Sequence, residues 1–307
     1  AIHFLKPYFI SLIKYIQYSK KMNKAYFKEL LFMLILCIAA ALLTSWLRCS
    51  SHILHNLNID IDDNAFTNMD ISCSYDELVN AADAINADKG QLMTICTCLY
   101  DGKISYDNLK KITRPLYVRI SNYLNRTQAD KFKQQKKIYN SILNDIRYFP
   151  VPRSDKRYEW VNYVNSWNNA RTYKGNRTHE GTDIMGDINK DGVYPVISVS
   201  DGYISNIGWL ELGGWRIGIT SCNGIYYYYA HLDSYYRDFK PGDKVKAGDI
   251  IGYMGSTGYS RVEGTKNKFP THLHFGIYII SDTKTEIAIN PYNILKINEN
   301  NALIYSY

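Results

Sequence analysis

Cysteine pairs with the spacing of a disulfide framework are missing from this sequence. No C-x-x-C motif occurs, Cys96 and Cys98 lie too close together to favour bonding each other, and Cys49 lacks the residues of a lipoprotein cleavage box. The expectation is therefore free thiols throughout. The six cysteines are Cys37, Cys49, Cys73, Cys96, Cys98 and Cys222.

Two further absences limit the class of protein. Of the 307 residues, 46% are hydrophobic and 21% are charged, so the low hydrophobicity of disordered chains and the repeat of collagen are both lacking. The length suits one or two domains with a packed core.

Charge of either sign is absent from residues 30–47, an apolar run of eighteen residues. Residues 1–29, which precede it, hold six lysines and one glutamate, for a net +5. An apolar helix of this length just spans a bilayer core of about 30 Å, and lysines before it place that side in the cytoplasm. We therefore expect a single-pass membrane anchor at 30–47 with the rest of the chain outside the cytoplasm. Trp46 suits the outer interface.

Two alternatives to an anchor are a cleaved signal peptide, leaving a secreted protein, and a buried soluble helix. The run is longer than a usual signal-peptide core of about 7–15 residues and ends in Trp-Leu-Arg, which favours an anchor. The first residue is Ala1 and Met22 opens a conventional export pattern, so residues 1–21 are interpreted as an upstream extension or as part of a trimmed chain.

The formal net charge of +7 does not indicate a nucleic-acid partner, because most of it lies in the N-terminal segment. Residues 30–307 carry 30 basic and 28 acidic groups, a net charge of +2, and contain no recognised nucleic-acid reader motif.

The middle of the chain, 48–147, has helical patterns and no residues that suggest chemistry. Ser74 and Glu77 have capping-box spacing before an apolar stripe. Further helices are predicted after Pro115 and from about Gln128. His52 and His55 have no third ligand and are interpreted as exposed. The segment is predicted to be a small helical spacer, and the proline pair in 148–152 marks its boundary with a final domain over 148–307.

The final domain is predicted to be mainly antiparallel β, a folded sheet or sandwich. From Asp183 onward, short strand patterns alternate with turns. Asn223-Gly224, between two apolar strand patterns, is the strongest hairpin signal, and Asp201-Gly202 marks another turn.

Four of the seven histidines lie in this β-rich region. His179 and Asp183 form an H-x-x-x-D motif, and His231 closes a tyrosine-rich strand. His272 and His274 stand two apart, so on a strand they share one face, while Leu273 and Phe275 point to the other.

A catalytic zinc site needs three nitrogen or oxygen ligands and an open position. His179, Asp183 and one histidine of the 272/274 pair would supply them, leaving two histidines free. Zinc polarises a carbonyl and lowers the pKa of bound water to about 7, and a free histidine is suited to pass the proton to a leaving amine.

Four motifs together resemble the lysostaphin/LytM-type zinc metallo-endopeptidases, which cut stem peptides or cross-bridges of bacterial peptidoglycan. The motifs are His179-x-x-x-Asp183, Tyr229-Ala-His231-Leu, Gly248-Asp-x-Ile-Gly-x-x-Gly-x-Thr-Gly258 and His272-Leu-His274. The resemblance covers about 150–295 and implies an antiparallel groove with one zinc on His179, Asp183 and His274. It further implies that His231 and His272 are the catalytic pair, one as base or water-orienting group and the other stabilising the oxyanion. It also matches Tyr173 with a transition-state-stabilising tyrosine of some members.

The expected function is thus a membrane-anchored, extracytoplasmic zinc endopeptidase that acts on peptidoglycan during cell-wall remodelling. The alternative is a non-catalytic scaffold or activator of the same fold that binds a cell-wall, division or sporulation partner. Degenerate members of the family normally lack a zinc ligand, and this chain lacks none, which favours the enzyme.

Overall fold

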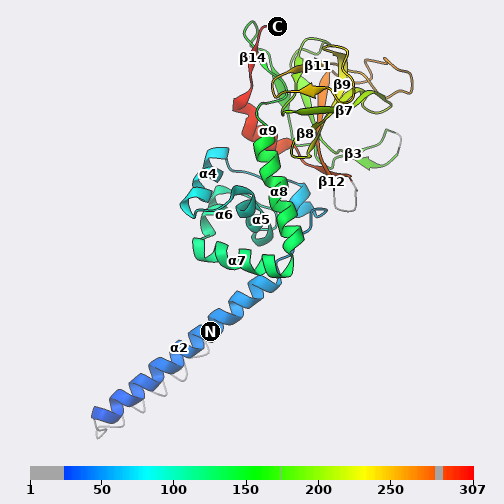
Figure 1. The fold of residues 1–307 in the computed structure, drawn as a ribbon. Coiled ribbons are helices and arrows are strands. Elements are labelled where there is room, and N and C mark those ends of the chain that lie inside the picture. The colour runs from blue at the N-terminus through cyan, green and yellow to red at the C-terminus, as the bar shows by residue number, and fades with distance from the viewer. Residues whose placement is uncertain (1–23, 174, 281–285) are drawn as a thin grey trace. The chain divides into compact units, whose positions relative to one another are not determined.

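A computed structural model of the protein describes residues 24–173, 175–280 and 286–307 (Figure 1). The chain divides into two compact units, Ala1–Leu57 and Asn58–Tyr307.

The described part of the first unit is one helix, α2 (Lys24–His55), of 32 residues. It contains the uncharged run 30–47, whereas most of the lysine-rich segment 1–29 lies outside the described residues. In the described part of the chain, no helix has both the length and the apolar character required to cross a membrane. The membrane anchor predicted at 30–47 is therefore not supported.

The three helices predicted in the middle of the chain are present. In α4 (Tyr75–Ala84) the Ser74 hydroxyl accepts from the Glu77 backbone N–H, and the Glu77 carboxylate accepts from the Ser74 N–H, which completes the capping box. Pro115 lies in the first turn of α7 (Arg114–Thr127), and α8 (Ala129–Asp145) begins beside Gln128.

Three other helices lie between residues 58 and 147: α3 (Asn64–Thr67), α5 (Lys89–Leu99) and α6 (Tyr106–Lys111). The sequence pattern of α5 did not predict a helix, because α5 is buried on nearly every side rather than along one stripe. It packs against α8, where the Thr97 hydroxyl hydrogen-bonds the buried Tyr139 hydroxyl at 2.8 Å.

The rest of the chain is built mainly on antiparallel strands, as predicted. One sheet has ten strands, in the order β10-β7-β8-β9-β12-β5-β2, with β13 paired to β12 and β11 paired to both β6 and β9. Its strands are β2 (Val161–Tyr163), β5 (Thr182–Gly186), β6 (Pro195–Ile197), β7 (Gly202–Leu210), β8 (Gly214–Ser221), β9 (Tyr226–Tyr235), β10 (Lys244–Val245), β11 (Ile250–Met254), β12 (His272–Ile280) and β13 (Glu286–Ile289).

Four short strands form two separate pairs. β3 (Ala170–Arg171) and β4 (Arg177–Thr178) make a small antiparallel hairpin, and β1 (Arg153–Ser154) pairs in parallel with β14 (Ile304–Tyr305). Between β13 and β14 the chain forms α9 (Tyr292–Asn298) and a 3₁₀ turn, Glu299–Asn301.

The two turn signals had different outcomes. Asn223-Gly224 joins β8 to β9 as a hairpin, as predicted, with Gly224 at a φ of +87°, a conformation that favours glycine. Asp201-Gly202 separates β6 from β7, but those strands do not pair with each other. β6 pairs instead with β11, about fifty residues later, a partner that a local turn pattern cannot reveal.

Alternate residues of β9 and β12 fill the core of the sheet. Tyr227, Tyr229, Leu273 and Phe275 are all fully buried. The Phe275 ring packs edge-on against Tyr229 and stacks with Tyr227, at centroid distances of 5.3 and 6.4 Å. Leu273 and Phe275 therefore point away from the histidines beside them in sequence, as the period of two predicted.

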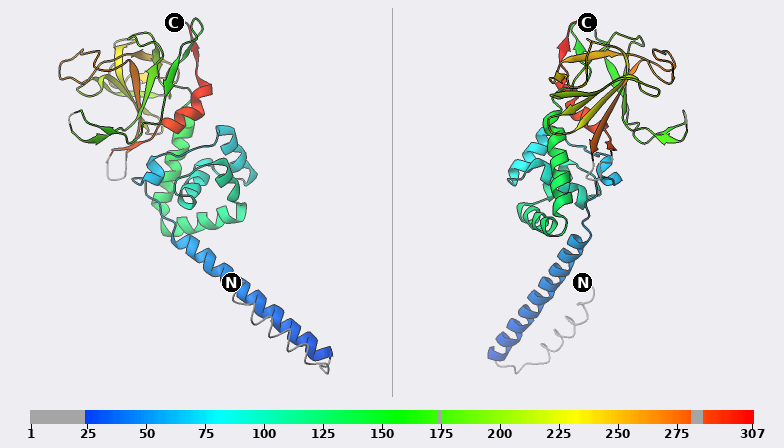
Figure 2. Two further views of the ribbon diagram at one scale, coloured as in Figure 1. Left: turned by 180° about the vertical axis from the view of Figure 1, so that it is seen from behind. Right: turned by 45° about the vertical axis from the view of Figure 1, so that its right-hand side comes forward.

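Polar contacts join the helices to the sheet within the second unit. The buried Asp145 carboxylate, at the end of α8, accepts hydrogen bonds from Asn223 Nδ2 at 2.6 Å and Tyr227 Oη at 3.4 Å. Burial raises the pKa of Asp145 above its ordinary value. Figure 2 shows α9 where the helices between residues 58 and 147 meet the strands. Asn293, on α9, donates a hydrogen bond to the Met69 carbonyl. The division between a spacer at 48–147 and a final domain at 148–307 stays a prediction.

The described cysteines Cys37, Cys73, Cys96, Cys98 and Cys222 are free thiols, as predicted.

Candidate active site

Three neighbouring strands bring the candidate residues together. β12 pairs with β5 on one side, where His274 lies opposite Asp183, and with β9 on the other, where His274 lies opposite Ala230. His179 precedes β5 by three residues and His231 follows Ala230. Sequence positions almost a hundred residues apart thus meet on one face of the sheet.

His179, Asp183 and His274 form a compact group of potential metal ligands. His179 Nε2 lies 3.0 Å from Asp183 Oδ1 and 3.0 Å from His274 Nδ1, which is itself 3.0 Å from the same carboxylate oxygen. Ligands at about 2.0–2.1 Å from a tetrahedral zinc ion stand about 3.3 Å apart. The donor atoms and their spacing therefore fit a zinc-sized ion.

Gly181, inside the H-x-x-x-D motif, allows this close approach. A Cβ atom at this position would lie 2.6 Å from both Cε1 and Nε2 of His274. Any side chain would therefore displace His274 from its place beside Asp183, so the motif needs glycine here for packing reasons.

Neighbouring groups orient the three side chains. The His179 Nδ1 atom lies 3.1 Å from the Ser166 carbonyl oxygen and 3.0 Å from its hydroxyl. Because a carbonyl only accepts, Nδ1 carries the proton and the Nε2 lone pair faces Asp183. Burial raises the pKa of Asp183, but the adjoining His179 and His274 side chains outweigh it and hold the pKa far below its ordinary value. The carboxyl group is therefore an anion.

His231 reaches this group because the strand carrying it is irregular. Alternation along β9 would send His231 to the core, since its neighbour Ala230 already lines the groove. His231 has instead a φ of +61°, and the pairing of β9 with β8 shifts register just there. Such a bulge redirects a side chain, and a positive φ on a non-glycine residue costs about 1–3 kcal/mol. The irregularity places both Ala230 and His231 at the groove.

His231 and His272 are held in the same tautomer, with the proton on Nδ1. His231 Nδ1 donates to the Thr257 carbonyl at 2.7 Å, and His272 Nδ1 donates to the Pro270 carbonyl at 2.7 Å. In both rings Nε2 is therefore the atom left to accept a proton. Burial lowers the pKa of each, which favours the neutral form, and their ring centroids lie 4.7 Å apart.

A groove of about 390 Å³ contains all five of these residues. Tyr228, Tyr278, Tyr259 and Phe269 also line it, and the His231 ring packs against Phe269 at a centroid distance of 4.5 Å. Aromatic walls beside a few polar groups are typical of a site that binds an extended ligand.

The other sequence candidate, Tyr173, lies beside the groove and is absent from its described lining. Its ring stacks on Tyr259 at a centroid distance of 4.6 Å, and its hydroxyl donates to the Tyr259 carbonyl at 2.8 Å. In this arrangement the Tyr173 hydroxyl is engaged with the chain itself. A transition-state role for Tyr173 stays a prediction.

Sequence reasoning missed two arginines in the groove, Arg171 and Arg177. Arg171 Nη2 donates to Asp183 Oδ2 at 2.6 Å, on the carboxylate oxygen that faces away from His179. Neither arginine belongs to a recognisable motif. The available signal was the position of Arg177, two residues before His179.

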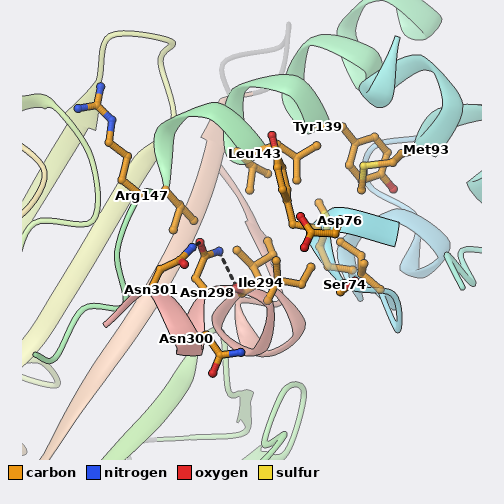
Figure 3. A pocket seen from close by; sticks show the side chains of 16 residues that line it. Ser74, Asp76, Met93, Tyr139, Leu143, Arg147, Ile294, Asn298, Asn300 and Asn301 are labelled. Carbon is orange, nitrogen blue, oxygen red and sulfur yellow. Dashed lines mark hydrogen bonds between the residues drawn. The ribbon is translucent and has the colours of Figure 1, made fainter. Parts of the chain in front are cut away.

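A second cavity lies among the helices and lacks the chemistry of the first. Its volume is about 430 Å³, and side chains from α4, α5, α8 and α9 enclose it, including Met93, Leu143 and Ile294 (Figure 3). Asp76 and Arg147 are among its lining residues, and no histidine or cysteine lines it. The groove on the sheet is therefore the candidate active site.

The groove lies on an antiparallel sheet and holds three potential metal ligands beside two further histidines. This combination is typical of a metallopeptidase. Residues 177–291 match the family model of Peptidase family M23. The chain is 40% identical to a Ruminococcus gnavus protein of known structure, provisionally named a glycyl-glycine endopeptidase, lytM. The match covers 80% of this chain and 95% of that chain, and its TM-score is 0.65. This chain belongs to Peptidase family M23, and the predicted LytM-type resemblance is confirmed.

Two curated relatives show the same relationship. The chain is 35% identical over 217 residues to an L-Ala–D-Glu endopeptidase of Bacillus subtilis, covering 69% of this chain and 61% of the relative. It is 39% identical over 99 residues to the glycyl-glycine endopeptidase ALE-1 of Staphylococcus capitis, covering 32% and 24% respectively. The chain thus spans less than two thirds of the length of either.

Proposed function

We propose that this protein is a zinc-dependent endopeptidase that hydrolyses peptide bonds in the stem peptides or cross-bridges of peptidoglycan. The observation that carries the proposal is the meeting of three ligand atoms, each 3.0 Å from the others, with His231 and His272 in one groove. The names of the M23 relatives support peptide-bond cleavage. A scaffold without catalysis would not need this complete set.

The metal would be held by His179 Nε2, Asp183 Oδ1 and His274 Nδ1, the atoms that already converge. Zinc bound there would supply Lewis-acid chemistry, polarising the scissile carbonyl and making water more acidic. Three protein ligands leave a fourth position open, as in catalytic zinc sites.

His231 and His272 supply proton transfer and charge stabilisation in this proposal. Each presents an unprotonated Nε2 atom, fixed by the carbonyl bound at Nδ1. One ring takes a proton from the attacking water and returns it to the leaving amine. The other ring stabilises the negative charge that develops on the carbonyl oxygen once its own Nε2 has taken up a proton and can donate. Their lowered pKa values keep both rings available as bases near neutral pH.

A direct test is to incubate the full chain with zinc and purified sacculi of several wall chemotypes. We expect new amino termini to appear, because an endopeptidase exposes one amine for each bond cut. Mass spectrometry of the released fragments then identifies the bond. A complete lack of release from all chemotypes, by zinc-loaded protein, would contradict the proposal.

The place of action stays a prediction from the sequence. A peptidoglycan substrate requires residues 48–307 to be outside the cytoplasm, and the lysine-rich, then uncharged N-terminal pattern supports export, either with residues 30–47 retained or after cleavage. Protease added to intact spheroplasts should digest the sheet-bearing unit. Full protection until lysis would contradict an extracytoplasmic location.

Arg171 is proposed as a positioning residue for Asp183. Arg171→Gln removes the donor on Asp183 Oδ2, so we expect zinc affinity to fall by about 10- to 100-fold, the usual effect of losing a partner of a metal ligand. Competition with a chelator measures this. The control is Arg147→Gln, which removes an exposed arginine–aspartate pair to Asp201. Unchanged zinc affinity in Arg171→Gln would contradict the role.

A further inference from the structure

Two arginines stand directly opposite each other on the β3–β4 hairpin. Arg171 is the register partner of Arg177, and each strand has only two residues. Like charges opposite each other destabilise a strand pair, and an isolated two-stranded hairpin is marginal in any case. A contribution to the stability of the hairpin therefore does not explain why two arginines lie opposite each other.

The two guanidinium groups differ in what they bind. Arg171 is satisfied by Asp183, whereas the Nε atom of Arg177 is buried and has no hydrogen-bond partner. The contact of Arg177 Nη2 with the Tyr259 hydroxyl is long, at 3.5 Å. Among the described residues no carboxylate forms an ion pair with Arg177, although Glu180 lines the same groove. A buried donor without a partner calls for a ligand or another explanation.

The position of Arg177 places this donor beside the reaction centre. It lies two residues before His179 in an extended segment, so both side chains project to the same side of the chain. Both residues line the groove with His274. A group held by Arg177 would therefore belong to a substrate residue next to the scissile bond.

We propose that Arg177 is a specificity-determining residue that binds a free carboxylate on the substrate residue adjoining the scissile bond. The two Nη atoms of a guanidinium together match the two oxygens of a carboxylate. This inference rests on the proposed peptidase function and narrows it from any wall peptide to an acidic stem peptide, because a glycine cross-bridge carries no side-chain carboxylate. The name of the Bacillus subtilis relative also places a glutamate at the bond which that protein cuts.

The test uses two stem peptides that share an L-Ala–D-Glu bond and differ only in whether the free carboxyl group of the glutamate is a carboxylate or a carboxamide. The full chain should prefer the carboxylate peptide by about 10- to 100-fold in kcat/KM, the range expected for a hydrogen bond to a charged group. Arg177→Gln should remove that preference by slowing the carboxylate peptide alone. Arg177→Lys should restore part of it, since the charge returns without the paired donors.

Arg261→Gln is the matched control, because the Arg261 side chain is 85% exposed, pairs with Glu211, and like Glu211 is not among the residues that line the groove. Zinc content and thermal unfolding of each variant establish that the fold is kept. If Arg177→Gln does not fold, the preference of the unaltered chain between the two peptides still decides.

Equal cleavage of both peptides by the unaltered chain would overturn the proposal, as would equal losses on both in Arg177→Gln, or faster cleavage of pentaglycine. Each of these outcomes leaves peptidase function intact. Inactivity on every peptide and sacculus would instead contradict the proposed function. In that case calorimetry with the product peptide carrying an amino-terminal D-Glu, compared with its carboxamide, tests the Arg177 subsite without catalysis.

Discussion

Replacing His274 by alanine is expected to abolish both zinc binding and peptidase activity. His274 Nδ1 is one of three donor atoms within 3.0 Å of each other, and its loss leaves two, too few for a stable catalytic zinc site. Because Lewis-acid stabilisation contributes several kcal/mol to such reactions, kcat/KM should fall by at least about a thousandfold. Metal analysis of the purified variant and cleavage of sacculi measure the two effects.

His55→Ala is the control for removing a histidine, since His55 lies at the end of α2 and not in the groove. Its zinc content and activity should equal those of the unaltered chain. Stoichiometric zinc in His274→Ala, with activity retained, would show that the ligand set is not the one proposed. His179→Ala and Asp183→Ala should behave as His274→Ala does, because all three residues meet at one point.

Replacing His231 or His272 by alanine should also abolish catalysis, but in contrast to His274→Ala these variants should retain zinc. Neither histidine is one of the three potential metal ligands, but both line the groove. A positioned general acid–base group contributes about 10²- to 10⁴-fold, so kcat should fall by that factor. KM should change little, since the loss is in the transition state. Steady-state kinetics on a defined stem peptide separate the two parameters.

The double variant gives a sharper result than either single one. Residues that act as a unit in one transition state are not additive, so His231→Ala combined with His272→Ala should be little slower than the worse single variant. A fully multiplicative loss would show that the two rings act independently. Loss of zinc from either single variant would move that histidine from the catalytic pair to the ligand set.

The sequence predicted which five residues would meet through the resemblance of its four motifs to the lysostaphin/LytM-type family, whereas alternation alone predicted only that His272 and His274 share a face. It could not predict how His231 arrives there. Strict alternation along β9 assigns His231 to the core, and a bulge with positive φ, invisible in the residue pattern, turns it toward the groove.

The arginines were missed for a different reason. Arg171 and Arg177 matter through their cross-strand pairing and through the distance from Arg171 to Asp183, and both are tertiary facts. Elsewhere, α5 was missed because a helix buried on nearly every side shows no stripe, and the β6–β11 pair because its strands are far apart in sequence. The anchor predicted at 30–47 rested on length and charge pattern, and the described structure gives it no support.

The tyrosines that open β9 serve two different structural roles in turn along the strand. Tyr227 and Tyr229 are fully buried against Phe275, so replacements there must keep the volume of the core. Tyr228, between them, lines the groove. Substitutions at the groove-facing positions can therefore change what this strand presents to a ligand without disturbing the packing behind it. An inserted residue, in contrast, would exchange the two sets at once and cost both stability and recognition.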